Sequence, residues 1–193
     1  ITKQLVDLGF FMRGVIYWDK GVSVGISTAW GSWRSASNPT LRDVGEYILV
    51  FSKDNFRMEG GNKISTISAK QFTTYTKSLW TFATVRPEDN DHPAPFPDEL
   101  PKRLILLYTY LGDTVLDPFL GSGTTCKMAK ALGRKSIGYE IDQSYKPEIE
   151  AKIRKVESIG LSLDVFTANG KKESRQVLPS IPISLRSAMS DSS

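Results

Sequence analysis

The sequence predicts an α/β fold with a mixed, mostly parallel sheet and helices on both of its faces. Three observations support this fold class. A short β-prone run at 114–116 leads into a glycine-rich turn, and a segment of helical composition follows at 127–132. A second β-prone run at 135–140 comes next, and an almost wholly apolar run lies earlier, at 46–51. Strands that alternate with helical segments are typical of parallel sheets.

The glycine-rich turn has the composition of a nucleotide or nucleoside cradle. Gly121 and Gly123 permit tight backbone geometry and let a ligand approach the main chain closely. The free N–H groups of the helix that opens behind them point toward such a ligand. Glu140 lies 19 positions after Gly121, where an acid holds the ribose diol in dinucleotide-binding folds. The turn has no third glycine, which departs from the nicotinamide fingerprint.

Further motifs stand in a fixed order around this turn. The turn itself, Asp117-Pro-Phe-Leu-Gly-Ser-Gly123, is followed by Gly138-Tyr-Glu140 and preceded by His92-Pro-Ala-Pro-Phe-Pro97. The earlier motifs are 30–33, 36–39, 41–43 and 46–53. In this order they resemble the amino-group DNA methyltransferases of the permuted β class, over roughly residues 10–150. The resemblance is more specific than a glycine turn alone.

The resemblance implies a Rossmann-like methyltransferase fold with S-adenosylmethionine as the cofactor. The methionine end would lie over the turn and Phe96-Pro97, and the ribose hydroxyls would bind Glu140. The implied cofactor residues are Phe96, Pro97, Asp117, Phe119, Gly121, Ser122, Gly123, Thr124, Glu140 and Ile141. Double-stranded DNA with a flipped target base is the implied partner. Its implied contacts are Arg34, Ser35, Asn38 and Arg42, where guanidinium groups and hydroxyls would hold phosphate and sugar.

The tetrapeptide that activates the target amine in this family is absent from the sequence. In the family an Asp, Asn or Ser is followed by Pro-Pro and an aromatic residue that stacks on the flipped base. Neither 37–40 nor 117–120 matches it, so we assign no catalytic residue to this chain. In the permuted order the tetrapeptide precedes the strand that starts at Phe10, and residues 1–8 have the pattern of the end of an amphipathic helix. We therefore expect an N-terminally incomplete methyltransferase, inactive alone, whose missing segment was lost or belongs to another polypeptide.

The leading interpretation is a site-specific DNA methyltransferase of the restriction-modification type that acts on an exocyclic amine. N4 of cytosine is slightly favoured over N6 of adenine. Two alternatives stay open. One is a chain that holds S-adenosylmethionine or DNA without catalysing, and the other is a nicotinamide-dependent oxidoreductase. The sequence does not indicate the recognition site or the oligomeric state, and a homodimer is compatible with it.

The domain organisation follows from the resemblance. We place residues 1–53 and 92–157 in one catalytic and cofactor domain, 54–91 in a short target-recognition insertion, and 158–193 in a C-terminal tail. Within the insertion, Ser68 has the character of a helix N-cap and 71–80 that of a helix. Basic and acidic residues balance there, so base reading would use hydroxyls, amides and aromatic rings. The alternative that this segment is a solvent-exposed loop region without a role in DNA binding stays open.

Local patterns predict the remaining elements. Strands are expected at 10–18, at 46–51 with both faces buried, and at 161–166, whereas helices are expected at 100–111 and 145–156. The rest of the chain beyond Gly160 has no sustained periodicity of apolar residues and is expected to be loosely ordered.

Composition limits the function classes further. The single cysteine, Cys126, excludes an internal disulfide framework and has the place of a packed small hydrophobe. With His92 as the only histidine we expect no metal site, and the resemblance gives His92 a role in shaping the cofactor loop instead of in catalysis. A net charge of +4 is too modest to indicate a polyanionic partner. No apolar window reaches membrane-spanning length and no secretory leader is visible, so we expect a cytoplasmic protein.

Overall fold

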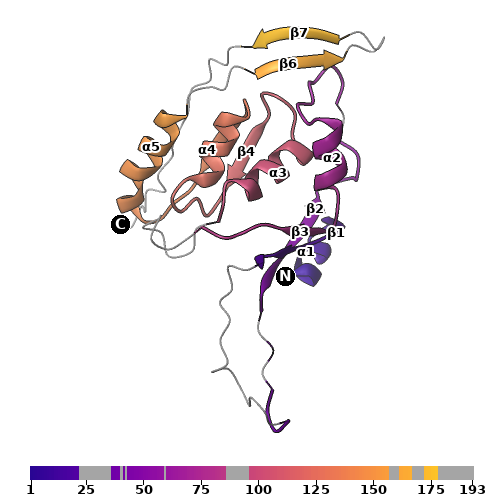
Figure 1. The fold of residues 1–193 in the computed structure, drawn as a ribbon, viewed down its shortest axis with the longest axis vertical. Coiled ribbons are helices and arrows are strands. Elements are labelled where there is room, and N and C mark those ends of the chain that lie inside the picture. Colours follow the sequence, from indigo (N-terminus) through magenta and orange to yellow (C-terminus); the bar gives the residue numbers. More distant parts are fainter. Residues whose placement is uncertain are drawn as a thin grey trace. The chain divides into compact units, whose positions relative to one another are not determined.

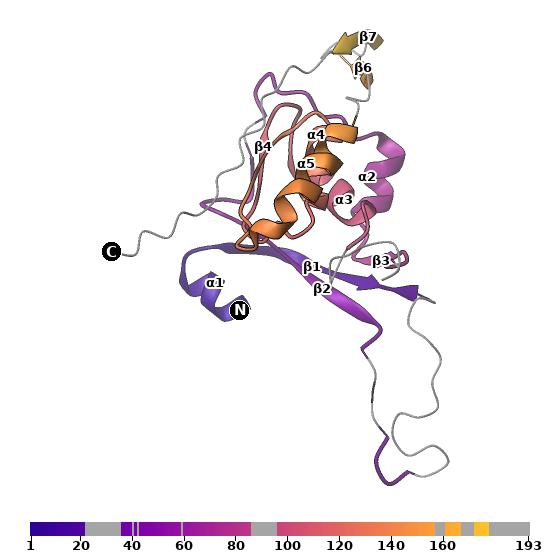
Figure 2. The same cartoon turned by 90° about the vertical axis from the view of Figure 1, so that its left-hand side faces the viewer.

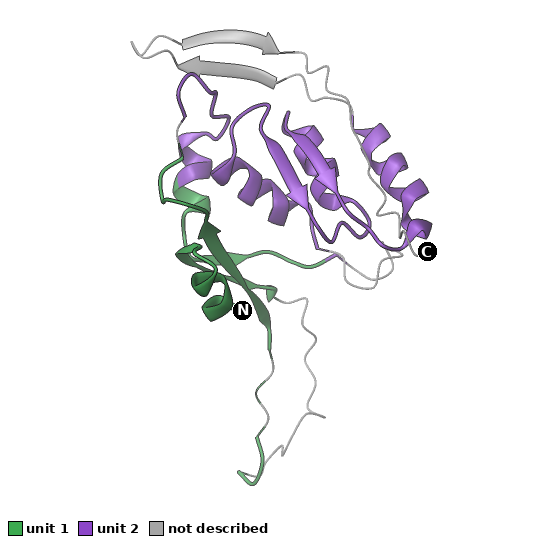
Figure 3. Ribbon diagram, turned by 180° about the vertical axis from the view of Figure 1, so that it is seen from behind, with its two compact units in different colours: residues 1–59, 73–84 green, residues 60–72, 85–193 purple. Residues whose placement is uncertain are grey.

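The computed structural model describes residues 1–21, 36–39, 41, 43–58, 60–85, 96–156, 161–166 and 172–177. The chain divides into two compact units, coloured separately in Figure 3. Unit 1 comprises residues 1–59 and 73–84, and unit 2 comprises residues 60–72 and 85–193. No helix in the described part of the chain is long and apolar enough to cross a lipid bilayer.

Unit 1 is built on a three-stranded mixed sheet. The elements are α1 (Thr2–Asp7), β1 (Phe11–Asp19), β2 (Gly45–Ser52) and β3 (Leu79–Thr81). Strand β1 lies in the middle, antiparallel to β2 and parallel to β3. Figure 1 labels these elements. The buried Trp18 indole donates a hydrogen bond to the Phe82 carbonyl at 2.8 Å and stacks on the Phe82 ring. Aromatic and β-branched residues favour strands, and they supply most of this core.

Two local predictions are wrong in this part of the chain. The helix predicted over 71–80 is shorter, since α2 spans Ala69–Tyr75 and Trp80 lies in β3. Trp80 is buried there and donates its indole N–H to the Tyr75 carbonyl at 3.1 Å, so packing overrides the helical composition. Strand β2 is not buried on both faces. Its Tyr47 is 73% exposed, because β2 is an edge strand that pairs only with β1 among the described strands.

The start of α2 matches its prediction. Ser68 Oγ accepts a hydrogen bond from the Gln71 N–H at 3.2 Å, and Gln71 Oε1 accepts one from the Ser68 N–H at 2.9 Å. This reciprocal pair is a capping box, which satisfies two N–H groups that the first helical turn leaves free. Ser68 therefore caps the helix as expected.

Unit 2 contains a β-α-β arrangement around the glycine turn. Strands β4 (Thr114–Asp117) and β5 (Lys135–Gly138) are parallel neighbours, and α4 (Thr124–Ala131) connects them. Helices α3 (Glu99–Tyr108) and α5 (Lys146–Lys155) both pack against α4, as Figure 2 shows, and a short 3-10 turn, η3 (Gln143–Tyr145), precedes α5. These parallel strands and the mixed sheet of unit 1 confirm the α/β prediction.

The C-terminal region contains a pair of antiparallel strands. Strand β6 (Leu161–Phe166) has the predicted bounds, and an unpredicted strand, β7 (Lys172–Val177), pairs antiparallel with it. The segment 54–91 does not form a unit of its own. Its residues divide between unit 1 and unit 2, and whether it reads DNA stays a prediction.

Candidate functional site

The backbone turns sharply between β4 and α4. Gly121 has a φ of 52° and Gly123 a φ of 87°, both in the left-handed region that L side chains rarely adopt. Space is limited at the second position as well, because a Cβ on Gly123 would lie 3.1 Å from Cγ2 of Ile149 in α5. Glycine at these positions lets the chain turn tightly and enter α4 with the free N–H groups of its first turn beside the bend.

Glu140 follows β5 and is hydrogen-bonded to this turn. Its Oε2 accepts a hydrogen bond from the Gly121 N–H at 2.7 Å, and its Oε1 accepts one from the Asp142 N–H at 2.9 Å. The main chain reinforces the connection, since the Leu120 N–H donates to the Tyr139 carbonyl at 2.9 Å. The acid and the turn therefore lie together at the carboxyl ends of two parallel strands, where ligands bind in α/β sheets.

Two residues shape the turn from inside. Asp117 Oδ1 accepts a hydrogen bond from the Phe119 N–H at 3.0 Å, which holds the start of the turn. Leu120 is buried against Gly138, where an added Cβ would lie 2.5 Å from Leu120 Cδ2. Gly138 is therefore required so that Leu120 can pack between the two strand ends.

Two large apolar side chains remain uncovered at the same strand ends. Phe119 is 87% exposed and Ile141 is 95% exposed, although Leu120 beside the first is buried and Glu140 and Asp142 beside the second are hydrogen-bonded. Apolar surface beside a few fixed polar groups is the usual composition of a site for a small organic ligand.

The structure brings most of the predicted cofactor residues into one place. The turn and the strand ends hold Asp117, Phe119, Gly121, Ser122, Gly123, Thr124, Glu140 and Ile141. Ser122 and Thr124 are buried, so they present main-chain groups more readily than hydroxyls. Phe96 and Pro97 directly precede α3 and are half-buried. The neighbouring Asp98 forms an ion pair of 2.5 Å with Lys127 on α4, which ties this segment to the helix behind the turn.

The predicted DNA contacts are only partly described. Asn38 is exposed. Arg34, Ser35 and Arg42 lie outside the described residues, and so does His92. Their roles stay predictions.

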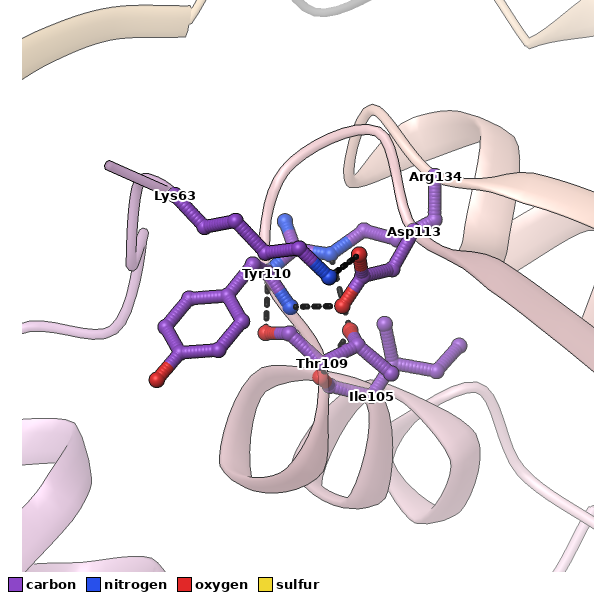
Figure 4. A network of polar contacts seen from close by, with 6 residues as sticks. All are labelled: Lys63, Ile105, Thr109, Tyr110, Asp113 and Arg134. Atoms are coloured by element: carbon purple, nitrogen blue, oxygen red, sulfur yellow. Dashed lines mark hydrogen bonds and ion pairs between the residues drawn. The ribbon is translucent and has the colours of Figure 1, made fainter. Parts of the chain in front are cut away.

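A second polar cluster in unit 2 was not predicted from the sequence. Its centre is Arg134 (Figure 4). This residue is only 2% exposed. Nε donates to Thr109 Oγ1 at 2.9 Å and Nη2 to the Thr109 carbonyl at 2.9 Å. Nη1 donates to Thr66 Oγ1 at 2.7 Å and to the Leu132 carbonyl at 2.6 Å. Burial lowers the pKa of Arg134 to about 10, so the guanidinium stays charged at neutral pH.

Asp113 lies at the edge of this cluster. Its carboxylate accepts hydrogen bonds from the Tyr110 N–H at 2.9 Å and from Lys63 Nζ at 2.9 Å. Burial alone would raise the pKa of Asp113. The two hydrogen bonds, together with the charges of Lys63 and Arg134, lower the pKa below its ordinary value instead. No sequence signal marks the cluster, because threonine, lysine and arginine at these spacings are usual on a protein surface.

Comparison with known proteins decides the family. Residues 1–151 match the model of the N6/N4 methyltransferases, described as DNA methylase. The chain belongs to the DNA methylase family. It is 41% identical over 177 residues to the type II methyltransferase M.MjaI of Methanocaldococcus jannaschii, covering 88% of this chain and 58% of that protein. It is 34% identical over 179 residues to M.BglI of Bacillus subtilis, covering 92% and 48%.

A solved structure gives the same result for the fold. The complex with S-adenosyl-L-methionine of a Thermus thermophilus protein, described as a DNA modification methylase, aligns with a TM-score of 0.62 and 28% identity. The alignment covers 81% of this chain and 59% of that one. This DNA methylase chain thus spans about half the length of the curated relatives above. The family resemblance predicted from the ordered motifs is confirmed.

In this methylase chain Cys126 is a packing residue, as the sequence predicts. Its thiol is buried against Leu120 and Ile149 beside the turn. Burial raises the pKa of the Cys126 thiol. A hydrogen bond with Ser136 opposes this effect and the charge of Asp117 adds to it. A buried thiol with a raised pKa is a poor nucleophile.

Proposed function

We propose that this chain is the S-adenosylmethionine-binding and DNA-recognition portion of a restriction-modification methyltransferase that methylates an exocyclic amine. The observation that carries the proposal is the Glu140 carboxylate, hydrogen-bonded to the Gly121 N–H at the ends of two parallel strands. Membership of the DNA methylase family gives this site its chemistry. It favours methyl transfer over the hydride transfer that a glycine turn alone leaves open.

The residues around the turn fit this cofactor. An ionised carboxylate offers about four acceptor positions, and Glu140 uses two of them for main-chain N–H groups. The other two can accept the ribose hydroxyls. The exposed Phe119 and Ile141 side chains offer apolar contact to a planar base, and the N–H groups at the start of α4 can hold the methionine end. When bound, the sulfonium group of the cofactor supplies the methyl.

The acceptor that we propose is an exocyclic nitrogen and not C5 of cytosine. Methylation at C5 needs a cysteine thiolate that first adds to the ring. Cys126, the single cysteine, is buried with a raised pKa and is unsuited to that step. Transfer to an amine needs no covalent intermediate. We favour N4 of cytosine slightly over N6 of adenine as the acceptor.

Calorimetry tests the cofactor proposal. We expect S-adenosylmethionine to bind the chain, and Glu140→Ala to weaken binding by about 1 to 3 kcal/mol, because two charge-assisted hydrogen bonds are lost. Titration with NADH is the control for the oxidoreductase alternative. Unchanged affinity for S-adenosylmethionine in Glu140→Ala would remove this carboxylate from the site.

Catalysis requires, in our proposal, a polypeptide segment beyond this chain. The family tetrapeptide is absent from the sequence, so we expect no methyl transfer to DNA by the 193-residue chain alone. Supplying the upstream segment, joined or as a separate polypeptide, should restore turnover. Methylation of DNA by the chain alone would contradict the assignment of a binding portion.

Two groups of residues should contribute to DNA binding in different ways. We propose that Arg34 and Arg42 contact phosphates and that residues 62–80 read base edges. Phosphate contacts determine the salt dependence of affinity, whereas base contacts determine site preference. Arg34→Ala and Arg42→Ala should each reduce the slope of affinity against salt, and an unchanged slope would reject the phosphate role.

A further inference from the structure

The segment 60–66, which we call the strap, is bound to the rest of unit 2 by side-chain and main-chain contacts. The Leu111 N–H donates to the Ile64 carbonyl at 2.9 Å. Lys63 Nζ binds the Asp113 carboxylate at 2.9 Å, as Figure 4 shows. At the other end of the strap, Thr66 Oγ1 accepts from Arg134 Nη1 at 2.7 Å. The strap is therefore held along its length.

Close packing adds to these bonds at the start of the strap. A Cβ on Gly60 would lie 2.7 Å from the Tyr110 hydroxyl oxygen, so the tyrosine lies directly on the backbone. The Lys63 ammonium is also 5.8 Å from the centre of the Tyr110 ring, within the range of a cation–π contact. Immediately after the strap, the capping box of Ser68 and Gln71 opens α2. The position of the strap thus sets where α2 begins.

Stability alone is a poor reason for a buried arginine at this place. Burying a cation is costly, and a core in which the cation and its polar partners are all replaced by apolar side chains is often as stable or more stable. Arg134 instead directs four N–H bonds to three separate segments, ending at Thr66, Thr109 and Leu132. Thr109 is in turn fixed to the end of α3, because its hydroxyl donates to the Ile105 carbonyl at 2.5 Å. A planar guanidinium with fixed donor directions suits such a three-way link.

The link also connects the strap with the glycine turn. Helix α4 begins directly after Gly123 and ends shortly before Arg134, and Leu132, whose carbonyl Arg134 holds, is the C-cap residue of that helix. One short helix therefore has the turn at its start and the buried guanidinium at its end.

We propose that Arg134 is a positioning residue for DNA recognition: through Thr66 it fixes the strap and the first turn of α2 relative to the glycine turn. This inference rests on the proposed function, which assigns base reading to residues 62–80. The link sharpens site preference because base-contacting groups that are held in one place discriminate better than mobile ones.

The test removes one hydrogen bond and keeps the side-chain shape. Thr66→Val lacks the acceptor for Arg134, whereas Thr66→Ser keeps it and serves as the matched control. Each 193-residue chain selects duplexes from a randomised DNA pool in the presence of S-adenosylmethionine, and the enrichment of the preferred sequence over the pool is measured. Calorimetry measures S-adenosylmethionine affinity on the same samples, and hydrogen exchange measures protection of the Leu111 amide, which donates to the strap.

We expect Thr66→Val to lower enrichment about tenfold, the effect of a little over 1 kcal/mol. Thr66→Ser should retain it, and S-adenosylmethionine affinity should stay within about twofold in both. Lower protection of Leu111 with unchanged enrichment would overturn the inference, because the strap would then be loosened without effect on recognition. Enrichment of no sequence by the unsubstituted chain would also overturn it. In that case the calorimetry would still decide the cofactor proposal independently.

Discussion

Unit 2 contains two charged groups that interact with the surrounding protein in opposite ways. The Glu140 carboxylate accepts two N–H bonds and lies beside exposed apolar side chains, so part of its hydrogen-bonding capacity remains for a ligand. The Arg134 guanidinium is buried and gives four N–H bonds to the protein. The first arrangement is suited to binding and the second to fixing segments in place. A group that can bind a ligand is therefore recognised by hydrogen-bonding capacity that the protein leaves unused, more than by its charge.

The largest expected effect contrasts these two groups directly. Arg134→Met should lower the free energy of unfolding by about 3 kcal/mol, because it leaves half-buried acceptors at Thr66, Thr109 and Leu132 without the donor that Arg134 supplies. Glu140→Gln, which keeps the side-chain shape at a more open place, should lower it by less than about 1 kcal/mol. Urea unfolding of both variants checks this. Equal losses would break the distinction between a fixing group and a binding group.

A smaller loss is expected where the two strand ends are packed. Gly138→Ala places a Cβ 2.5 Å from Leu120, whose side chain is buried and must shift. We expect a destabilisation of about 1 to 3 kcal/mol and weaker S-adenosylmethionine binding, since the turn moves with Leu120. Thermal unfolding and calorimetry measure the two effects. Gly14→Ala is the matched control, because Gly14 also lies in a strand without a left-handed φ and nothing lies within 4 Å of a Cβ there.

The pH dependence of stability tests the edge of the Arg134 cluster. The folded-state pKa of Asp113 is lowered from its ordinary 3.8, so the ionised carboxylate stabilises the fold above that value. This contribution should disappear as the pH falls through the folded-state pKa. Unfolding free energies of the unsubstituted chain and of Asp113→Asn, measured across pH 2 to about 6, should therefore converge at low pH. A constant difference over that range would mean that the ion pair with Lys63 contributes nothing.

The smallest effect is expected at the buried thiol. Cys126→Ser, in a chain completed with its upstream segment, should keep at least about half of the single-turnover rate, because amine methylation needs no thiolate. Mass analysis of the modified nucleoside belongs to the same experiment. Loss of turnover with 5-methylcytosine as the product of the unsubstituted enzyme would overturn the amine assignment. N4-methylcytosine or N6-methyladenine would support it and identify the base.

Elements with a strong local pattern were predictable from the sequence. The glycine turn, its flanking strands β4 and β5, and the capped start of α2 follow from composition and spacing, since the interactions that define them are local. The acid at Glu140 was also predictable, because its distance from Gly121 reflects the length of one β-α-β crossover.

Features that depend on distant partners were not predictable. Trp80 belongs to a strand only because β1 offers it a parallel neighbour 62 positions earlier in the chain, at Trp18. The burial of Arg134 depends on Thr66, which is 68 positions away. Nothing in the sequence around Arg134 indicates that a charged side chain there is covered.

The contact between Leu120 and Gly138 has a consequence for sequence variation among homologues. One residue belongs to the turn and the other to the end of β5, and a side chain at the second position would occupy the volume of the first. The two positions should therefore covary. Relatives with a larger residue at the second position should carry a smaller one at the first, and the pair is best exchanged together when a turn from one methylase is grafted into another.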